Sequence, residues 1–328
     1  MKHRLLCLAA AACAVLAALA AGVPAGEAAT PEPQLLARYQ PVTQFDPLER
    51  FLPTKVQSFV SDADLEQLVG ANWTLVDTDP EPGKLPTSGT WRLNQDSCSP
   101  SALLGGLDCY ASASAKGSGG PAVYGRVAHE DGRIVLQYWY FYYEDVYSYE
   151  YPPSNFIWQA HEGDWEVVNV VLSEDEQPLF VGYSQHCLGQ RRDWIDTLRF
   201  DETHPIVHVA LGSHANYFSA GEHPIALACV PPAARAVLTQ LILPPPSDFA
   251  FPGETTGPAA VAGPVTTIHR IEDDHPAWMS FPGFWGEVQY FHGPGPIGPI
   301  PFGTSPQGPE FHSAWTDPLE TLATWPEG

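Results

Sequence analysis

Short apolar runs with the spacing of β-strands dominate this chain. They cover residues 134–143, 165–172, 179–184 and 206–211. Several of these runs are apolar on both faces, which is typical of strands buried inside a sandwich. The link 173–178 is short and polar, so we expect the second and third strands to pair as an antiparallel hairpin.

Helical spacing is found in few stretches. Residues 61–68 begin with Ser and Asp, which are good cap residues, and have apolar positions three apart. Residues 232–243 form a second candidate helix, which a run of prolines ends. We expect a surface loop at 244–266 and no regular ladder at 293–309, because proline removes backbone donors. The pattern predicts a mostly-β fold: an antiparallel β-sandwich with a few short helices and long Pro/Gly-rich loops.

Residues 1–29 resemble a secretory signal peptide. A positively charged start leads into an Ala-rich apolar run at 5–21, and small residues follow. No other stretch of the sequence is long and apolar enough to cross a membrane. We therefore expect a secreted single domain at 30–328, with a Pro/Gly-rich C-terminal segment at 293–328.

The processed chain would be strongly acidic. Removal of Lys2, Arg4 and Glu27 with the leader leaves 13 basic and 37 acidic residues, a net charge of −24. Such a surface repels nucleic acid and anionic lipid. Contact with a membrane would require a neutral lipid, a glycan or a bridging cation.

Four cysteines lie beyond the leader: Cys98, Cys109, Cys187 and Cys229. An even number in an exported chain predicts disulfides. Of the three possible pairings we favour Cys98–Cys109, which closes a short loop, and Cys187–Cys229. Free buried thiols are the alternative, and the spacing does not fit a zinc site.

The segment His-Glu-Gly-Asp-Trp-Glu at 161–166 gathers one imidazole and three carboxylates. Asp164 and Glu166 begin a strand and are two apart, so they point the same way, and His161 can fold back beside them. These three side chains could hold a divalent cation such as Ca²⁺, Mg²⁺, Mn²⁺ or Zn²⁺. They could instead form a hydrogen-bonded brace for the loop. Asp and Glu are rarely buried unless paired or metal-bound, which favours the cation.

An aromatic strand precedes this segment. Nine of the fifteen residues from 137 to 151 are aromatic. Alternate positions must pack in the core. The others, among them Tyr142, Tyr147 and Tyr149, could offer flat rings to a sugar face or a lipid headgroup.

Two further histidines, His186 and His214, follow other strands. If the sheet gathers the strand ends, both could surround Asp164 and Glu166. With Glu162 they would then be candidates for proton transfer in a metal-dependent hydrolase. Clustered histidines would favour such an enzyme, and scattered ones would favour binding. No serine-hydrolase elbow, phosphate loop or dinucleotide fingerprint accompanies them.

Motifs along most of residues 38–318 resemble, in order, proteins related to the fungal vacuolar protein sorting-associated protein 62. They include Tyr-Gln-Pro at 39–41, the aromatic strand, HEGDWE, YSQH, GSHANYF and Phe-Trp-Gly at 284–286. The biochemistry of that family is poorly defined, so the resemblance implies little about activity.

A shorter segment resembles the necrosis- and ethylene-inducing toxins. Those secreted cytolysins carry an aromatic strand followed by Gly-His-Arg-His-Asp-Trp-Glu, and a cation is held there at the membrane-facing end of a β-sandwich. The sequence departs from that pattern at Gly163, where the family has its second His. The resemblance implies the cation ligands His161, Asp164, Glu166 and Asp145.

These observations together predict a secreted, cytolysin-like protein that binds a glycan or lipid headgroup through a divalent cation and nearby aromatic rings. An exported metal-dependent hydrolase is one alternative. A structural protein with no ligand at 161–166 is the other.

Overall fold

The structure is a computed structural model of the whole chain. It describes residues 29–95, 98, 106–117, 122–151, 154–230, 232, 235, 247–250, 267–271, 276–291 and 300–328. The predicted signal peptide lies almost entirely outside the described residues. Residues 32–328 form one compact unit, and the description below concerns that unit.

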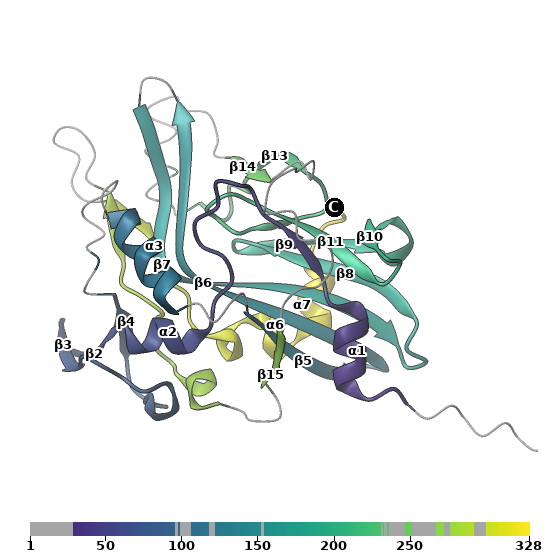
Figure 1. Cartoon of the computed structure of the whole chain (residues 1–328), viewed down its shortest axis with the longest axis horizontal. Coiled ribbons are helices and arrows are strands. Elements are labelled where there is room, and N and C mark those ends of the chain that lie inside the picture. The colour runs from purple at the N-terminus through teal and green to yellow at the C-terminus, as the bar shows by residue number, and fades with distance from the viewer. Residues whose placement is uncertain are drawn as a thin grey trace, which may run out of the picture. The chain divides into compact units, whose positions relative to one another are not determined.

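A six-stranded sheet in the order β15-β5-β6-β7-β8-β9 is the centre of the fold (Figure 1). Its pairs are antiparallel except for β15 with β5. Three of the predicted strands lie in β6, β7 and β8, and the predicted hairpin between β7 and β8 is confirmed. The strands are β15 (Thr267–Arg270), β5 (Ala122–Glu130), β6 (Arg133–Tyr151), β7 (Ser154–Ser173), β8 (Pro178–Gln185) and β9 (Leu188–Asp193).

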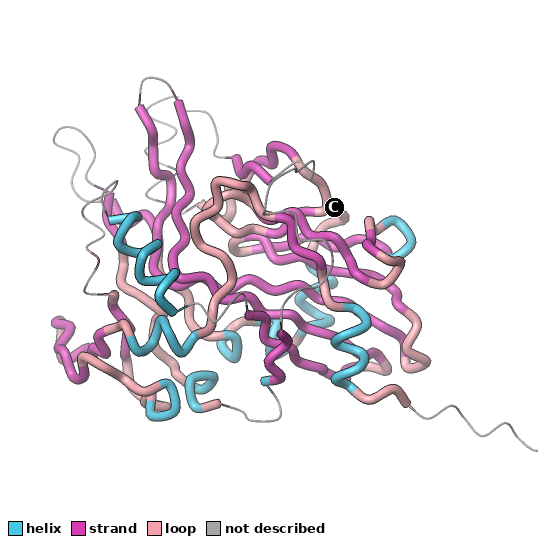
Figure 2. Tube along the Cα trace, viewed as in Figure 1, coloured by secondary structure: helices cyan, strands magenta, loops and turns pink. Residues whose placement is uncertain are grey.

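A smaller sheet and helix α1 cover one face of the central sheet. In it β11, the fourth predicted strand, pairs in parallel with β1 and antiparallel with β10 and β12. Val207 and Val209 share a buried apolar cluster with Leu36 and Tyr138. This packing of sheet on sheet confirms the predicted mostly-β sandwich, and Figure 2 shows how far strands dominate. The elements are α1 (Glu32–Tyr39), β1 (Val42–Gln44), β10 (Arg199–Phe200), β11 (His204–Val209) and β12 (Asn216–Tyr217).

Helices and loops cover the opposite face. Phe59, Trp278 and Trp285 pack there against Phe141 and Trp165 of the central sheet. The rings of Phe141 and Trp165 have centroids 4.8 Å apart, and such large buried aromatics dominate core stability. The elements of this layer are α2 (Val56–Ser61), α3 (Gly106–Gly117), η1 (Pro82–Lys84), η3 (Ala277–Ser280), η4 (Pro309–Phe311), α6 (Ser313–Thr316) and α7 (Pro318–Thr324).

Residues near the C-terminus close this layer. A Cβ at Gly182 would lie 2.1 Å from Leu322, and one at Gly189 would lie 2.4 Å from the ring of Trp325. The two glycines therefore let Leu322 and Trp325 approach the strands, and Trp325 is only 7% exposed.

The predicted helix at 61–68 is wrong. Helix α2 ends at Ser61, and the residues after it form β2 (Asp64–Val69) between β3 (Asn72–Asp77) and β4 (Trp91–Asn94). Leu65 and Leu68, three apart, fit a helix, but pairing on both edges outweighs this local preference. Gly70 has φ +66° and turns the chain from β2 into β3.

The Pro-rich segments contain more strand than predicted. Within 293–309, β17 (Ile300–Gly303) pairs with β16 (Gln289–Phe291), with an irregular register. Within 244–266, β14 (Ser247–Ala250) pairs with β13 (Gly221–Pro224). Both are two-stranded sheets, whose outer edges tolerate proline. Of the predicted helix at 232–243, only residues 232 and 235 are described, and both are helical.

Both predicted disulfides are present. Cys98 pairs with Cys109 and Cys187 with Cys229, at Cα–Cα distances of 5.5 and 5.3 Å. One further short helix, η2 (Trp194–Asp196), follows β9. Among the helices that the structure describes, none is both long enough and apolar enough to span a bilayer.

Candidate metal centre

A bend in the β6–β7 hairpin controls which side chains meet. Gly163 lies at the bend with φ +59°, and a Cβ there would lie 2.3 Å from the carbonyl oxygen of Trp285. Only glycine combines that backbone conformation with so close an approach. Regular alternation would place Glu162 on the same side as Asp164. Instead Glu162 contacts α3, while His161 lies on the side of Asp164.

Asp145, His161 and Asp164 converge on this side of the hairpin. Asp145 lies directly opposite His161 in the ladder, and its Oδ2 is 3.3 Å from Nε2 of the imidazole. One ligand atom from each of the three lies within 4.8 Å of the others. All three residues are buried. We call this set the cation cluster.

The backbone carbonyl of Gly163 fixes the orientation of the His161 ring. Its Nδ1 lies 2.9 Å from the carbonyl oxygen of Gly163, and a ring nitrogen facing a carbonyl must donate. In the neutral ring the lone pair is then on Nε2, facing the carboxylate of Asp145. Two lone pairs at this distance repel each other, so either a second proton or a cation must lie between them.

His214 extends the network beyond the cation cluster. Its Nδ1 lies 3.0 Å from Asp164 Oδ2, and its Nε2 lies 3.5 Å from Glu49 Oε1. The ring of Tyr142 stacks on it with centroids 3.8 Å apart and 2° between planes. The backbone N–H of Gly212 donates to Glu49 over 2.7 Å. The sequence patterns indicated His214 as a site residue but did not indicate Glu49.

Glu166 lies beside the cation cluster but is not one of its three members. Ser184 donates to its carboxylate, and Nδ2 of Asn216 lies 3.5 Å away. Glu166 is buried. It points the same way as Asp164, as the strand period predicts, and its carboxylate is engaged by β8 and β12.

His186 belongs to a different network. Its Nε2 lies 2.8 Å from Oδ2 of Asp248, which also accepts hydrogen bonds from Ser213 over 2.8 Å and Tyr217 over 2.6 Å. We call this set the Asp248 network. The histidines are therefore only partly gathered: His214 touches the cation cluster and His186 does not. Asp248 was missed because it lies in a segment predicted as a loop.

Glu162 points to the other face of the hairpin. Tyr110 donates to its Oε1 over 2.7 Å, and the backbone N–H groups of Gln95 and Glu287 donate to its Oε2, each over 3.2 Å. Burial raises the pKa of Glu162 to about 7. The predicted role of Glu162 as a proton acceptor beside the cation is not supported by this position.

The aromatic strand does not offer the exposed platform that the sequence suggested. Tyr142 is fully buried, and His214 occupies one face of its ring. All six aromatic residues at 138–143 are buried, on alternate faces of the sheet. The side chains of Tyr147 and Tyr149 lie outside the described part of the structure.

Carboxyl groups outnumber imidazoles around the cation cluster. Burial raises the pKa of Asp145, and burial with the nearby Asp164 raises that of Glu166. Burial opposes charge on the two imidazoles, yet Asp145 raises the pKa of His161 to about 9, and Glu49 raises that of His214 to about 10. Four carboxyl groups, those of Glu49, Asp145, Asp164 and Glu166, thus surround two imidazoles. The raised pKa values of Asp145 and Glu166 show that burial opposes ionisation of the whole set without a further positive charge.

The donor set fits a divalent cation. Among the described residues, Oδ1 of Asp145 is buried without a hydrogen-bond partner. Carboxylate and imidazole are ligands for Zn²⁺ and Mn²⁺, and carboxylates also suit Ca²⁺ and Mg²⁺. A cation of charge two would favour the ionised form of these carboxyl groups.

No protein-family model matches the chain, and no curated protein sequence matches it. Fourteen chains of solved structures do match. One is necrosis and ethylene inducing protein 2 from the causal agent of cocoa's witches' broom disease, with 16% identity, a TM-score of 0.36, and coverage of 77% of this chain and 80% of that one. Another is the non-toxic protein HaNLP3, with 15% identity, a TM-score of 0.30, and coverage of 75% and 90%.

A third, described as a toxin fold for microbial attack and plant defense, has 14% identity, a TM-score of 0.33, and coverage of 61% and 67%. The necrosis- and ethylene-inducing proteins, which the segment at 161–166 resembles, are among these matches. None of the matches supports the resemblance to vacuolar sorting proteins. With TM-scores this low, the function is inferred from the site alone.

Proposed function

We propose that this is a secreted protein that binds a divalent cation through Asp145, His161 and Asp164, with Glu166 and His214 beside them. The observation that carries the proposal is the excess of buried carboxylates over positive groups, together with the unpartnered oxygen of Asp145. A buried carboxylate without compensation is costly. A cation removes that cost.

We propose further that the bound cation attaches the protein to a glycan or a lipid headgroup at a cell surface, in the manner of a cytolysin. The side chains of His161 and Asp164 retain 7% and 9% exposure, so protein atoms do not enclose them completely. A bound cation would supply an electrophilic centre for sugar hydroxyl or phosphate oxygens. A protein this acidic needs such a bridge to approach a membrane. The signal-like leader and two disulfides support export.

The test is elemental analysis and calorimetry of the mature protein with Ca²⁺, Mg²⁺, Mn²⁺ and Zn²⁺, comparing the wild type with Asp164→Asn. We expect near-stoichiometric binding by the wild type and at least tenfold weaker binding by the variant. Asp248→Asn is the matched control, because it also alters a buried, hydrogen-bonded aspartate. Absence of binding by the wild type to all four ions would leave the cluster as a structural brace.

Target binding is tested with the cation-loaded protein on glycan arrays and on neutral vesicles with and without glycosylated lipids. We expect binding that a chelator abolishes and that Asp164→Asn lacks. Cation binding without any glycan or lipid binding would reject the surface-binding part of the proposal and keep the metal site.

A metal-dependent hydrolase is the second candidate, because His214 lies next to Asp164 and can exchange a proton there. In that case His214→Gln would retain the cation and lose cation-dependent hydrolysis of ester or phosphoester substrates. Equal turnover by wild type and His214→Gln would remove the role of this histidine.

A further inference from the structure

We propose that Glu162 is a positioning residue for the cation cluster and that the Cys98–Cys109 disulfide holds it in place from the opposite face of the sheet. This inference rests on the proposed cation binding. It assigns a role in cation binding to residues on the opposite face of the hairpin, which would not contact the ligand.

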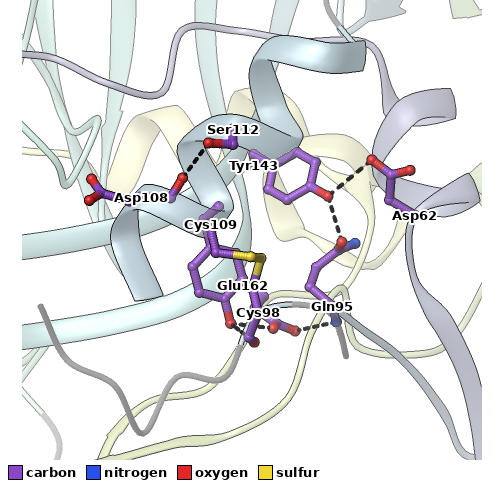
Figure 3. Close-up of a disulfide and its surroundings, with 9 residues drawn as sticks. Asp62, Gln95, Cys98, Asp108, Cys109, Ser112, Tyr143 and Glu162 are labelled. Carbon is purple, nitrogen blue, oxygen red and sulfur yellow. Dashed lines mark hydrogen bonds between the residues drawn. A yellow bond between two sulfur atoms is a disulfide. The ribbon is translucent and has the colours of Figure 1, made fainter. Parts of the chain in front are cut away.

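The first link runs from the disulfide to Glu162. Tyr110 directly follows Cys109 in α3, and its hydroxyl lies 2.8 Å from the carbonyl oxygen of Cys98 and 2.7 Å from Oε1 of Glu162. The disulfide thus fixes both ends of the short loop around this hydroxyl. Figure 3 draws the disulfide and the Glu162 carboxylate in one view.

The second link ties Glu162 to two other segments. Its Oε2 accepts the backbone N–H groups of Gln95 and Glu287, each over 3.2 Å. Gln95 is itself held in place. Its side chain accepts a hydrogen bond from Tyr143 over 2.5 Å (Figure 3), and it donates to the carbonyl oxygen of Phe59 over 2.8 Å. Glu162 is fully buried, so its carboxylate has three protein donors in place of water.

These contacts oppose the normal alternation of the strand. Without them Glu162 would turn to the side of Asp164, because successive side chains of a strand point to opposite faces and Gly163 opposes no rotation. His161 would then leave Asp164. The anchored carboxylate therefore maintains the reversal that gathers the ligands, in the way that outer residues orient metal ligands elsewhere.

The test measures Mn²⁺ affinity by calorimetry on the full mature chain, alongside thermal unfolding. Glu162→Ala should weaken Mn²⁺ binding by 10- to 100-fold, on the order seen for residues that orient metal ligands. Glu162→Gln keeps an acceptor for the two backbone donors and should restore affinity to within a few-fold of the wild type. The double variant Cys98→Ser/Cys109→Ser and the variant Tyr110→Phe should each weaken binding by an intermediate factor.

Gln137→Ala is the matched control. Gln137 is also fully buried in the central sheet, and it makes three hydrogen bonds, to Arg126, Asn169 and Ala314. It should lower the unfolding temperature like Glu162→Ala but leave Mn²⁺ affinity unchanged. Equal affinity losses in the two alanine variants would overturn the inference, since general destabilisation would then explain both.

Two further outcomes are decisive. If the wild type binds Mn²⁺ and Glu162→Ala binds it equally well, the inference fails and the proposed function stands. If the wild type binds no cation, both fail. Should Glu162→Ala not fold, unchanged affinity in both Tyr110→Phe and the double cysteine variant would overturn the inference.

Discussion

The cation cluster and the Asp248 network each contain a buried aspartate beside a histidine, Asp145 with His161 and Asp248 with His186. Asp248 is a single carboxylate with three donors, from His186, Ser213 and Tyr217. Burial opposes its ionisation, but His186 and these donors hold its pKa below the usual value. In the cation cluster burial raises the pKa of Asp145, and one of its oxygens has no partner among the described residues.

The comparison shows that residue type alone does not distinguish a structural hydrogen-bond network from a cation site. The two are distinguished by the number of hydrogen-bond donors available to each buried carboxylate. A satisfied carboxylate stabilises the fold without help. A set of carboxylates with too few donors is stable only when something with positive charge joins it. Four experiments test this difference between the cation cluster and the Asp248 network.

The largest effect is expected at the bend that forms the cation cluster. Gly163→Ala must hold φ near +59° and displace the carbonyl of Trp285. We expect a loss of about 3–5 kcal/mol in the free energy of unfolding, from backbone strain and overpacking together. Urea denaturation measures it. Gly70→Ala is the control, because Gly70 has φ +66° but open space around a Cβ, and it should cost only about 1 kcal/mol.

The second effect is the difference in stability between Asp248→Asn and Asp145→Asn when no cation is present. Asp248→Asn removes the charge that pairs with His186 and should destabilise the protein by about 3 kcal/mol. Asp145→Asn removes a charge from an overcrowded set and should be neutral or slightly stabilising in the presence of a chelator. Denaturation with chelator present compares them. Equal losses would mean that Asp145 is as well satisfied as Asp248.

The third effect is the response to cation. A ligand that binds only the folded protein at one hundred times its Kd adds about 2.7 kcal/mol to the free energy of unfolding. We expect this gain for the wild type and for Asp248→Asn, and none for Asp145→Asn. Thermal unfolding with and without the ion measures it. A gain in Asp145→Asn would place the binding site elsewhere.

The smallest effect is the pH dependence of the His186–Asp248 pair. Burial opposes charge on His186, but Asp248 raises its pKa to about 9. The charged His186 therefore contributes fully to the free energy of unfolding below its unfolded pKa of about 6.5. That contribution is lost as pH rises through 9. The pKa of Asp248 is lowered. The contribution of the ionised Asp248 to the free energy of unfolding is therefore lost only as pH falls below about 4. The stability difference between wild type and His186→Gln should be about 2 kcal/mol at pH 5–6 and vanish above pH 10. A difference that persists at pH 10 would contradict the ion pair.

Local patterns predicted four of the strands, the β7–β8 hairpin and the Cys98–Cys109 disulfide, because each depends on spacing within a short segment. The Cys187–Cys229 disulfide spans 42 residues and was predicted as the pair formed by the other two cysteines. The glycine in the segment at 161–166 indicated a turn that could bring His161 beside Asp164. The position of Glu162 could not be predicted, because it depends on donors from Tyr110, Gln95 and Glu287, which are distant in sequence. Glu49 reaches His214 only because β1 pairs with β11, a long-range pairing that no motif indicates. The helix predicted at 61–68 failed for the same reason, since neighbouring strands decided its conformation.

The packing of Trp325 against Gly189 has a consequence for the order in which the protein folds. The two residues are more than one hundred positions apart, and a Cβ at Gly189 would lie 2.4 Å from the Trp325 ring. Contacts this distant in sequence form slowly. We therefore expect β8 and β9 to pair first and to gain this aromatic cover late in folding.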